Sequence, residues 1–394
     1  MSPPPRNIAI IGAGLGGLLL ARILQLENVS FTIYESDADA SLRATFGGSL
    51  DLKYETGQRA MHAAGLHAEF LKLARPEGEQ MRILDKTGKI YHDVTETGAS
   101  FYNPEIDRGQ LRTLILDSLT PGTVQWGHKA TAVRKDADSG KYTIEFASGL
   151  TVENVDIVVG ADGAWSRVRP LIWDAKPIYS GVTFLETKID MAKNAHLSAL
   201  IGKGTMTALS DGKGLLAQLN STHAILYSAL RVPEDWAKTS AVAQAETTAE
   251  KLALMLEEFG GWHEELRELI RVGENPTVRP IYALPSDSLP RTKTDNIVLL
   301  GDAAHVLSPF GGDGANLAMA DAADLAKVLV SGQPLEKYEK LMRERGNEAC
   351  KGAAQNLELF FGENAAAVMA KFFDMPWGAG FLLKAWLYFR SFFW

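Results

Sequence analysis

Hydrophobic and polar positions repeat with two different periods along the chain, and the change of period marks the predicted elements. Residues 7–11 form an apolar run, a glycine-rich turn follows, and residues 18–26 carry apolar side chains at helical spacing. A second apolar run at 30–35 completes a strand–turn–helix–strand unit. The pattern therefore predicts two parallel strands joined by a crossover helix, the unit from which α/β proteins are built.

The remaining elements change character in the middle of the chain. Helices are predicted at 57–70, 104–119, 247–259, 314–330 and 334–361, with a further one ending near 270, and a hairpin at 81–94 turns at Thr87-Gly88. Strands alternate at 129–159 and again between 181 and 230, where they predict an antiparallel sheet with helical cover. A buried strand at 296–300 returns to the N-terminal pattern. The elements of one domain thus enclose a second one, so the first domain is discontinuous.

Composition narrows the class of protein. The 394 residues suggest two or three domains, and 46% hydrophobic with 22% charged residues exclude wholesale disorder. A net charge of −8 without a basic cluster argues against a nucleic-acid partner. Cys350 is the only cysteine, which excludes an internal disulfide and favours a reducing, cytoplasmic location. The eight histidines show no ligand spacing, so no metal is expected.

The two ends of the chain raise the question of targeting. Residues 1–14 lack the basic and apolar regions of a secretory signal. The apolar run at 372–394 is interrupted by charged residues and a proline, and is too short between them to cross a membrane. Phe381, Ala385 and Phe389 recur there at helical spacing. We expect this stripe to dock on the body of a monomer; a membrane-surface or dimer contact is the alternative.

The first motif is the glycine-rich turn Gly12-x-Gly14-x-x-Gly17. Gly12 permits the tight turn, Gly14 lets the backbone approach a pyrophosphate, and Gly17 lets the helix pack on the strand. The helix that follows directs N–H groups and partial positive charge at the phosphates. Glu35, at the end of the next strand, can accept hydrogen bonds from ribose hydroxyls and disfavours a 2′-phosphate. The resident nucleotide is therefore FAD or NAD rather than NADP.

Two further motifs also follow predicted strands. DGAWSRVR begins at Asp162, and GDAAH begins at Gly301 and continues as SPFGGDGAN up to Asn316. A strand-end aspartate can hold ribityl or ribose hydroxyls, and the glycines let backbone lie against a flat ring. The helix that begins near Gly314 directs its N–H groups at an anion, such as a reduced flavin.

Three residues of these motifs invite a catalytic interpretation. His305 follows a buried strand and is interpreted as a structural histidine. Ser166 lacks the elbow of a hydrolase nucleophile. Pro309 fixes its own φ angle, so its carbonyl could border the flavin edge; a rigid turn is the alternative. No side chain stands out as a general base.

The three motifs in this order and spacing resemble the FAD-dependent aromatic hydroxylases, the group A flavin monooxygenases. Within that family, GGSLDL at 47–52, GQRAM at 57–61 and NPEIDRGQLR at 103–112 are most similar to the tetracycline-inactivating flavin monooxygenases. The resemblance implies an α/β fold with a discontinuous, glutathione-reductase-like FAD domain at 1–70, 95–175 and 276–325. It also implies an inserted antiparallel substrate domain at 71–94 and 176–275, and C-terminal helices at 326–394 that bridge the two.

The resemblance also implies roles for individual residues. Those expected to contact FAD are Gly12, Gly14, Leu15 and Gly17 at the pyrophosphate, Glu35 at the adenosine ribose, Asp51 and Arg108, Asp302 at the ribityl chain, and Gly314, Ala315 and Asn316 at the flavin ring. Arg43 is matched to an arginine that contacts the nicotinamide cofactor. Asp162 belongs to a motif associated with both FAD and NADPH.

The expected substrate follows from the middle domain. Where the tetracycline-inactivating enzymes anchor their substrate with polar side chains, alignment places Glu186, Thr205 and Leu226. Phe184, Phe310 and Gly311 are further candidates for the lining of the substrate site. Two of three anchors are lost and one becomes an acid, so tetracycline is expected to bind weakly, whereas a related polycyclic or phenolic ring remains possible.

The function implied is an FAD-dependent monooxygenase that uses NAD(P)H and O₂ to hydroxylate an aromatic or enolic polycyclic molecule. Only one GxGxxG is present, so NADPH is expected to dock transiently. Two alternatives stay open. A flavin dehydrogenase or oxidase would take electrons from its substrate, and a ligand-binding protein would keep the fold without turnover.

Overall fold

The computed structural model describes residues 6–43, 47–94, 102–285 and 296–373. The chain forms two units: unit 1 comprises 1–77, 98–180 and 281–356, and unit 2 comprises 78–97, 181–280 and 357–394. Each unit has its own hydrophobic cluster. The segment expected as a separate set of bridging helices, 326–394, is divided between the units at residue 356.

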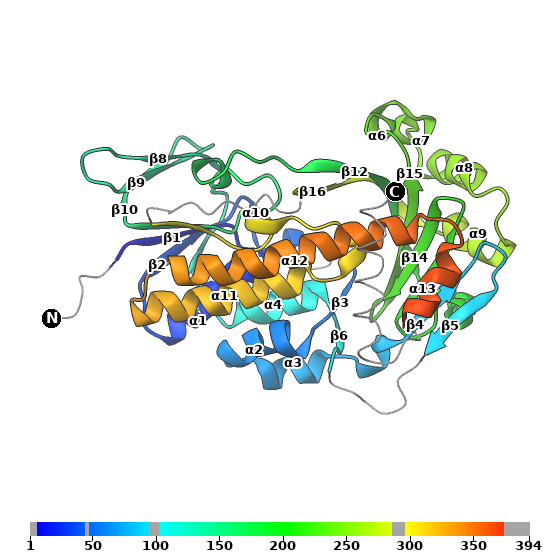
Figure 1. Ribbon diagram of the computed structural model, residues 1–394, viewed down its shortest axis with the longest axis horizontal. Helices are drawn as coiled ribbons and strands as arrows, with labels where there is room; N and C mark the ends of the chain where they lie inside the picture. Colours follow the sequence, from blue (N-terminus) through cyan, green and yellow to red (C-terminus); the bar gives the residue numbers. More distant parts are fainter. Residues whose placement is uncertain (1–5, 44–46, 95–101, 286–295, 374–394) are drawn as a thin grey trace, which may run out of the picture. The chain divides into compact units, whose positions relative to one another are not determined.

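Unit 1 is built on a five-stranded parallel sheet in the order β17-β11-β1-β2-β7 (Figure 1). Its strands are β1 (Ile8–Ile11), β2 (Phe31–Tyr34), β7 (Val124–Gln125), β11 (Ile157–Gly160) and β17 (Ile297–Leu299). Ile11 is in register with Tyr34 and with Gly160, which in turn faces Leu299. The carboxyl ends of these four strands therefore meet at one edge of the sheet, where α/β proteins bind ligands.

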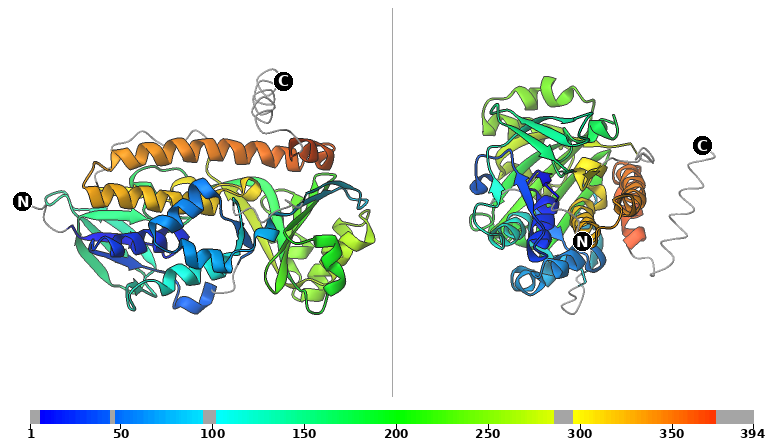
Figure 2. Two further views of the ribbon diagram at one scale, coloured as in Figure 1. Left: turned by 90° about the horizontal axis from the view of Figure 1, so that it is seen from below. Right: turned by 90° about the vertical axis from the view of Figure 1, so that its left-hand side faces the viewer.

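The helices of unit 1 pack on this sheet and on one another. α1 (Leu15–Leu26) is buried along most of its length and packs against α11 (Gly314–Ser331). α11 and the first part of α12 (Glu336–Phe360) run side by side (Figures 1 and 2). The other helices are α2 (Arg59–Ala63), α3 (His67–Leu73), α4 (Arg108–Asp117) and α10 (Asp302–His305), with a π-helical turn η2 (Tyr54–Gln58).

Unit 1 carries two smaller antiparallel sheets. β8 (Ala130–Lys135), β9 (Tyr142–Phe146) and β10 (Thr151–Val155) form one, and β3 (Ser49–Asp51) pairs with β6 (Glu105–Asp107) in the other. Two details of the sequence prediction are wrong here. The helix predicted at 104–119 starts only at Arg108, because 105–107 pair with β3, and the helix predicted at 57–70 is broken at Gly65, where φ is +66°.

Unit 2 contains a seven-stranded, mainly antiparallel sheet in the order β16-β12-β15-β14-β13-β4-β5. Its strands are β4 (Met81–Leu84), β5 (Ile90–Val94), β12 (Ile178–Asp190), β13 (Thr205–Ser210), β14 (Lys213–Leu219), β15 (His223–Arg231) and β16 (Glu274–Ala283), the last not predicted from the sequence. The hairpin predicted at 81–94 is confirmed, with Gly88 at φ +81°.

Helices cover both faces of the unit 2 sheet. α8 (Thr248–Glu258) and α9 (Glu264–Arg271) bury Met255, Phe259 and Leu266 against one face. α13 (Ala365–Phe373) packs on the other face, over β4, β5 and β13. The short helices are α5 (Ser198–Ile201), α6 (Trp236–Thr239) and α7 (Ala241–Gln244).

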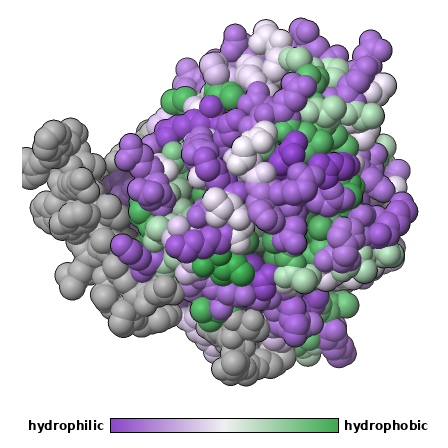
Figure 3. Space-filling view, turned by 90° about the vertical axis from the view of Figure 1, so that its right-hand side faces the viewer, coloured by the Kyte–Doolittle hydropathy of each residue, from purple (hydrophilic) through white to green (hydrophobic). Residues whose placement is uncertain are grey.

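The surface and the C-terminal run bear on the expected membrane behaviour. Hydrophilic side chains predominate on the face in Figure 3, and apolar ones form separate groups among them. No helix within the described ranges is long and apolar enough to cross a membrane. The stripe of Phe381, Ala385 and Phe389 lies outside the described residues.

Candidate functional site

The turn between β1 and α1 contains three glycines in three different surroundings. Gly12 has φ +108°, and a Cβ there would lie 2.3 Å from the carbonyl oxygen of Ala161. A Cβ on Gly17 would lie 2.1 Å from the carbonyl oxygen of Gly12. At Gly14, by contrast, no atom of the described residues lies within 4 Å of such a Cβ. Two glycines are therefore required by packing, and the third faces open space.

The N-terminus of α1 opens onto that space. Gly14 is its N-cap, and within the described structure no side chain caps the helix and its first turn holds no acidic residue. The free N–H groups from Leu15 onward can therefore donate to an anion. A diphosphate fits this arrangement, since it needs both donors and close backbone approach.

Glu35 holds the glycine-rich turn from the next strand. Its side chain is only 6% exposed, and Oε2 accepts from the backbone N–H of Ala13 at 2.6 Å. Oε1 accepts from Ser36 Oγ at 2.8 Å and from the N–H of Asp37 at 2.9 Å. The carboxylate is thus fixed beside the turn, at the place expected for an adenosine ribose.

Asp162 follows β11 with one carboxylate oxygen to spare. Oδ2 accepts from the N–H of Arg167 at 2.7 Å, whereas Oδ1 is inaccessible to solvent and has no hydrogen-bond partner among the described residues. Burial raises the pKa of Asp162 against the opposing hydrogen bonds from Ser166 and Arg167. A hydroxyl donor of a ligand would satisfy this oxygen. Ser166 itself caps the next turn, since its Oγ accepts from Arg169 N at 2.9 Å.

Arg169 lies between the two strand-end aspartates. Its side chain is 2% exposed and donates to the carbonyl oxygen of Ala164, while its Nη1 has no hydrogen-bond partner in the described part of the chain. Burial lowers the pKa of Arg169, and the charges of Asp162 and Asp302 oppose this. Its cation therefore reduces the repulsion between two carboxylates.

Asp302 is exposed at the first position of α10, directly after β17. A Cβ on Gly314 would lie 3.9 Å from its Oδ1, so its carboxylate lies next to the start of α11. No side chain caps α11 among the residues described. An acceptor for hydroxyls and a set of free N–H donors thus lie side by side, as a ribityl chain and a flavin ring require.

Asn316 contributes to this site as a brace. It is 1% exposed, its Nδ2 donates to the carbonyl oxygen of Asp51 at 2.7 Å, and its Oδ1 accepts from the N–H of Lys53 at 2.9 Å. Gly57 leaves room for the amide, because a Cβ there would lie 2.5 Å from Oδ1. Asn316 therefore ties α11 to β3, and Gly314 and Ala315 precede it at the helix start.

Asp51 and Arg108 lie at opposite ends of the β3–β6 ribbon. Asp51 is in register with Glu105, whose pKa is raised well above its ordinary value by burial and by the charge of Asp51. Arg108 is exposed at the start of α4, and a Cβ on Gly47 would lie 2.9 Å from its Cδ. Arg43 ends a 3₁₀ turn, and its side chain lies outside what the structure describes.

Pro309, Phe310 and Gly311 form the 3₁₀ turn η6 ahead of α11. Pro309 is exposed, whereas Phe310 is 7% exposed. The carbonyl oxygen of Phe310 accepts from Asn356 Nδ2 at 3.0 Å, which fixes the turn.

The substrate candidates of unit 2 do not all share one face of its sheet. Glu186 pairs with Tyr227 in the register of β12 and β15, and Phe184 contacts the ring of Tyr227 at 5.5 Å between centroids. Leu226 points the opposite way, fully buried in the cluster under α8 and α9. Because neighbouring strand residues face opposite sides, the alignment that grouped Leu226 with Glu186 is displaced by one residue.

Thr205 and Glu186 have polar partners on their own face. Thr205 is in register with Gln218. Glu186 Oε2 lies 2.6 Å from Arg279 Nε, and burial raises the pKa of Glu186 against the charge of Arg279. The acid expected at this position is therefore neutralised by an adjacent cation.

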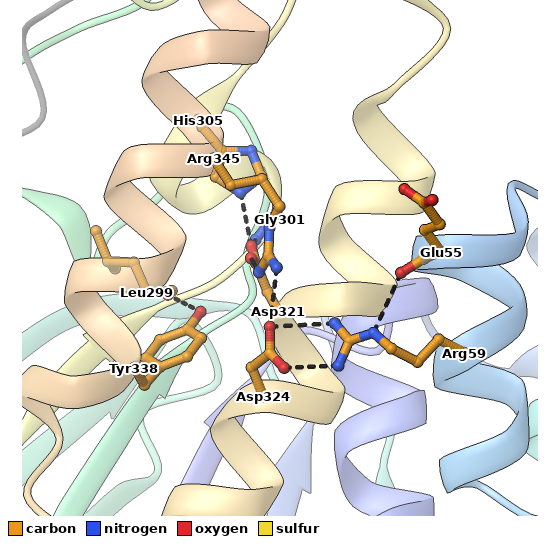
Figure 4. Close-up of polar contacts among 9 residues, drawn as sticks. All are labelled: Glu55, Arg59, Leu299, Gly301, His305, Asp321, Asp324, Tyr338 and Arg345. Atoms are coloured by element: carbon orange, nitrogen blue, oxygen red, sulfur yellow. Dashed lines mark hydrogen bonds and ion pairs between the residues drawn. The ribbon is translucent and has the colours of Figure 1, made fainter.

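Sequence reasoning missed Tyr227. It also missed the charged network around His305, which runs from buried Asp321 through Arg345 and Asp324 to the exposed Arg59 (Figure 4). A signal was present in MADAADLAKV, where two carboxylates interrupt an apolar helix three residues apart. Within the described ranges, no group of three potential metal ligands was found.

Comparison with known proteins defines the class. Residues 6–340 match the family described as FAD binding domain. The chain therefore belongs to this family, and the resemblance to the FAD-dependent aromatic hydroxylases is confirmed at that level.

Individual relatives match more than nine tenths of the chain. It is 32% identical to monooxygenase penA of Penicillium thymicola over 91% of this chain and 96% of that protein, and 33% identical to monooxygenase asqM of Emericella nidulans over 92% and 98%. Among solved structures, Klebsiella pneumoniae HpxO with FAD and uric acid matches with a TM-score of 0.76 at 20% identity over 93% of this chain and 91% of that one. Tetracycline destructase Tet(51) matches with a TM-score of 0.67 at 19% identity over 94% and 99%. These structural matches establish the α/β fold expected from the sequence.

Proposed function

We propose that the protein is an FAD-dependent monooxygenase that uses NADPH and O₂ to hydroxylate an aromatic or enolic polycyclic molecule. One observation carries the proposal: the open space at Gly14, the spare oxygen of Asp162 and the exposed carboxylate of Asp302 all lie at the same edge of one parallel sheet. The curated relatives penA and asqM are monooxygenases, in agreement with this proposal.

The residues proposed to hold FAD are those that the family resemblance implies, and the open space at Gly14 and the exposed carboxylate of Asp302 support this assignment. Gly12, Gly14, Leu15 and Gly17 would contact the pyrophosphate, Glu35 the adenosine ribose, Asp302 the ribityl chain, and Gly314, Ala315 and the backbone at Pro309 the ring. Asp51 and Arg108 complete the set. Bound FAD would supply electron transfer from a nicotinamide and the activation of O₂.

The chain's own contribution is positioning and charge. The start of α11, which no described side chain caps, presents N–H donors that would stabilise the negative edge of a bound flavin ring. Asn316 keeps this helix end fixed to β3 through two hydrogen bonds, so the donors need no rearrangement. Lys53 pairs with Asp313 at the same helix end, which keeps that carboxylate from repelling an anion.

NADPH and a cytoplasmic location belong to the same proposal. The single glycine-rich motif is assigned to FAD, so the nicotinamide would dock transiently near Asp162 and Arg43. The only cysteine, Cys350, is buried, and a single cysteine cannot form an internal disulfide, as suits a reducing compartment.

The substrate would lie against the sheet face of Phe184, Glu186 and Tyr227, with Thr205 as further lining on the same face. Two aromatic rings favour a flat ring system. Leu226 is left out because it is buried in the core of unit 2. Tetracycline is a poor candidate, because Arg279 already neutralises Glu186, the acid on this face.

The test is to purify the protein, identify its released cofactor by mass spectrometry, and follow NADPH oxidation in air with a panel of aromatic phenols. FAD and phenol-stimulated NADPH consumption with a hydroxylated product are expected. FMN, or no flavin, would contradict the FAD assignment. A flavin reduced by substrate but not by NADPH would favour the dehydrogenase or oxidase, and no turnover of any kind would favour a ligand-binding protein.

Tetracycline gives a second arm of this test. With tetracycline, we expect slow loss of the drug chromophore and release of hydrogen peroxide, because each unpaired buried polar group costs about 1–3 kcal/mol. Rapid drug loss stoichiometric with NADPH would contradict our assignment of the substrate face.

A further inference from the structure

One carboxylate oxygen holds both ends of the helix that carries Asp302. Asp321 Oδ2 accepts from the backbone N–H of Gly301 at 3.0 Å and from His305 Nε2 at 2.6 Å. Gly301 is the N-cap of α10 and His305 is its last residue. A helix of four residues is not stable by itself, because it has too few internal hydrogen bonds to offset its ordering. The geometry of α10 therefore depends on Asp321.

The other oxygen of Asp321 is anchored by a chain of ion pairs (Figure 4). Asp321 Oδ1 accepts from Arg345 Nη2 of α12 at 2.5 Å, and Arg345 Nη1 donates to Asp324 at 2.8 Å. Asp324 in turn accepts hydrogen bonds from both terminal nitrogens of Arg59 in α2, at 2.8 Å from Nη1 and 3.2 Å from Nη2. The carboxylate that holds both ends of α10 is thus connected to three helices far apart in sequence, namely α11, α12 and α2.

The charges of this group are matched inside the protein. His305 and Asp321 are both 0% exposed, where an unpaired charge would be strongly unfavourable. Burial alone would lower the pKa of His305, but the charge and hydrogen bond of Asp321, with a smaller contribution from Asp302, raise it. Burial likewise opposes ionisation of Asp321, but His305 and Arg345 hold its pKa below the ordinary value. Asp321 therefore favours the protonated form of His305, and His305 with Arg345 favours the ionised form of Asp321.

The backbone at Gly301 transmits this arrangement to the next residue. Gly301 has φ +56° and ψ −140°, and a Cβ there would lie 2.8 Å from the Cβ of Ala318. Its N–H is bound by Asp321, and its carbonyl oxygen accepts from the N–H groups of Ala304 and His305 at 2.8 Å each. With both groups fixed, the backbone position from which the Asp302 side chain extends is set.

We propose that Asp321 and His305 are positioning residues for cofactor binding: they hold α10 so that Asp302 faces the ribityl chain before FAD arrives. This inference rests on the proposed function, since it assumes that Asp302 contacts FAD.

The experiment measures two quantities on refolded apoprotein: the Kd for FAD, from the change in flavin fluorescence, and the Tm. We expect Asp321→Asn to raise the Kd about tenfold or more, because an amide cannot accept from Gly301, His305 and Arg345 together. Asp324→Asn is the matched control. It breaks the same network on the side away from α10, so it should lower the Tm and leave the Kd within about twofold.

A rescue and a double variant separate positioning from general stability. His305→Gln keeps an N–H that can reach Asp321 and should bind FAD nearly as well as wild type, whereas His305→Leu should not. If Asp321 acts through Asp302, then Asp302→Ala/Asp321→Asn should bind FAD no more weakly than Asp302→Ala alone. Additive losses in the double variant would overturn the inference.

The outcomes also separate this inference from the proposed function. Wild-type apoprotein that binds no FAD contradicts the function itself. Wild type that binds FAD, with Asp302→Ala weakened and Asp321→Asn unchanged, contradicts only the inference. If Asp321→Asn does not fold, the Kd of His305→Leu decides, and a His305→Leu that also fails to fold shows that the pair has a purely structural role.

Discussion

Gly14 and Gly17 stand three positions apart and have opposite surroundings. A methyl group on Gly17 would lie 2.1 Å from the carbonyl oxygen of Gly12, so Gly17→Ala must displace α1 from β1. A methyl on Gly14 meets no described atom within 4 Å, and its φ of −72° suits alanine. We expect Gly17→Ala to lower the Tm of the apoprotein clearly. Gly14→Ala should leave the free energy of unfolding unchanged or raise it by about 0.4–1 kcal/mol.

The same pair distinguishes packing from ligand binding. Gly14→Ala should weaken FAD binding although it folds, since the added methyl enters the space assigned to the pyrophosphate. Thermal unfolding and FAD titration on both variants test this. A Gly14→Ala protein with wild-type FAD affinity would mean that the diphosphate does not approach there.

Arg108 allows a similar comparison for a charged residue. Arg108 is exposed, and its side chain packs on Gly47. Two interpretations fit these surroundings: Arg108 contacts FAD, or it forms a surface ion pair that contributes about 0–1 kcal/mol to stability. We expect Arg108→Ala to weaken FAD retention while the apoprotein Tm changes little. Equal losses in the apo and FAD-bound forms would favour the surface role.

At the scale of elements, the register of β15 decides which side chains can meet a substrate. Leu226→Ala should destabilise the protein by about 2–5 kcal/mol, because it leaves a cavity under α8 and α9. Tyr227→Phe should change stability by less than about 1 kcal/mol but alter the KM for an aromatic substrate. Denaturant unfolding and NADPH oxidation assays measure these effects. A Leu226→Ala protein with normal stability and altered KM would reverse our assignment of the two faces.

Elements could be predicted where their stability is local. β1, α1 and β2 follow from an apolar run, a glycine turn and a helical repeat within the first 35 residues, and the strand-end groups Glu35, Asp162 and Asp302 follow with them. β6 could not be predicted, because residues 105–107 become a strand only by pairing with β3. The Asp321–His305 contact was likewise inaccessible, since it depends on how α10 packs on α11.

At the scale of the whole molecule, buried charges give stability a defined dependence on pH. Asp321 and Asp324 have pKa values lowered from 3.8 by their cationic partners despite burial, so their contribution is present above that pH and lost as the pH falls through the lowered values. The raised pKa of His305 makes its contribution complete below 6.5 and lost as the pH rises through the folded value. We expect the Tm to be highest between these limits and to fall toward alkaline pH.

Glu339 also contributes to the loss of folding stability toward alkaline pH, and its substitution separates that contribution from the others. Burial, with the charge of Glu336, raises its pKa from 4.5 to about 7, so folding becomes less favourable as the pH rises across this interval. Glu339→Gln should therefore raise stability at pH 8 by about 1 kcal/mol after allowance for solvent screening, and have no such effect at pH 4. Thermal unfolding at both pH values measures this. A gain of equal size at both would show that ionisation is not the cause.

The route of the chain through unit 1 has a consequence for biosynthesis. β1, β2 and β11 are all made by residue 160, but their neighbour β17, with Asp302 and α11, emerges only from residue 297 onward. A ribosome therefore completes the glycine-rich turn long before the groups assigned to the ribityl chain and the ring exist. A chain ended by a premature stop before residue 297 would keep half of a nucleotide site and lack the other half. With FAD held as proposed, cofactor loading would be a late event in the life of the nascent protein, after β17 and the start of α11 have been synthesised.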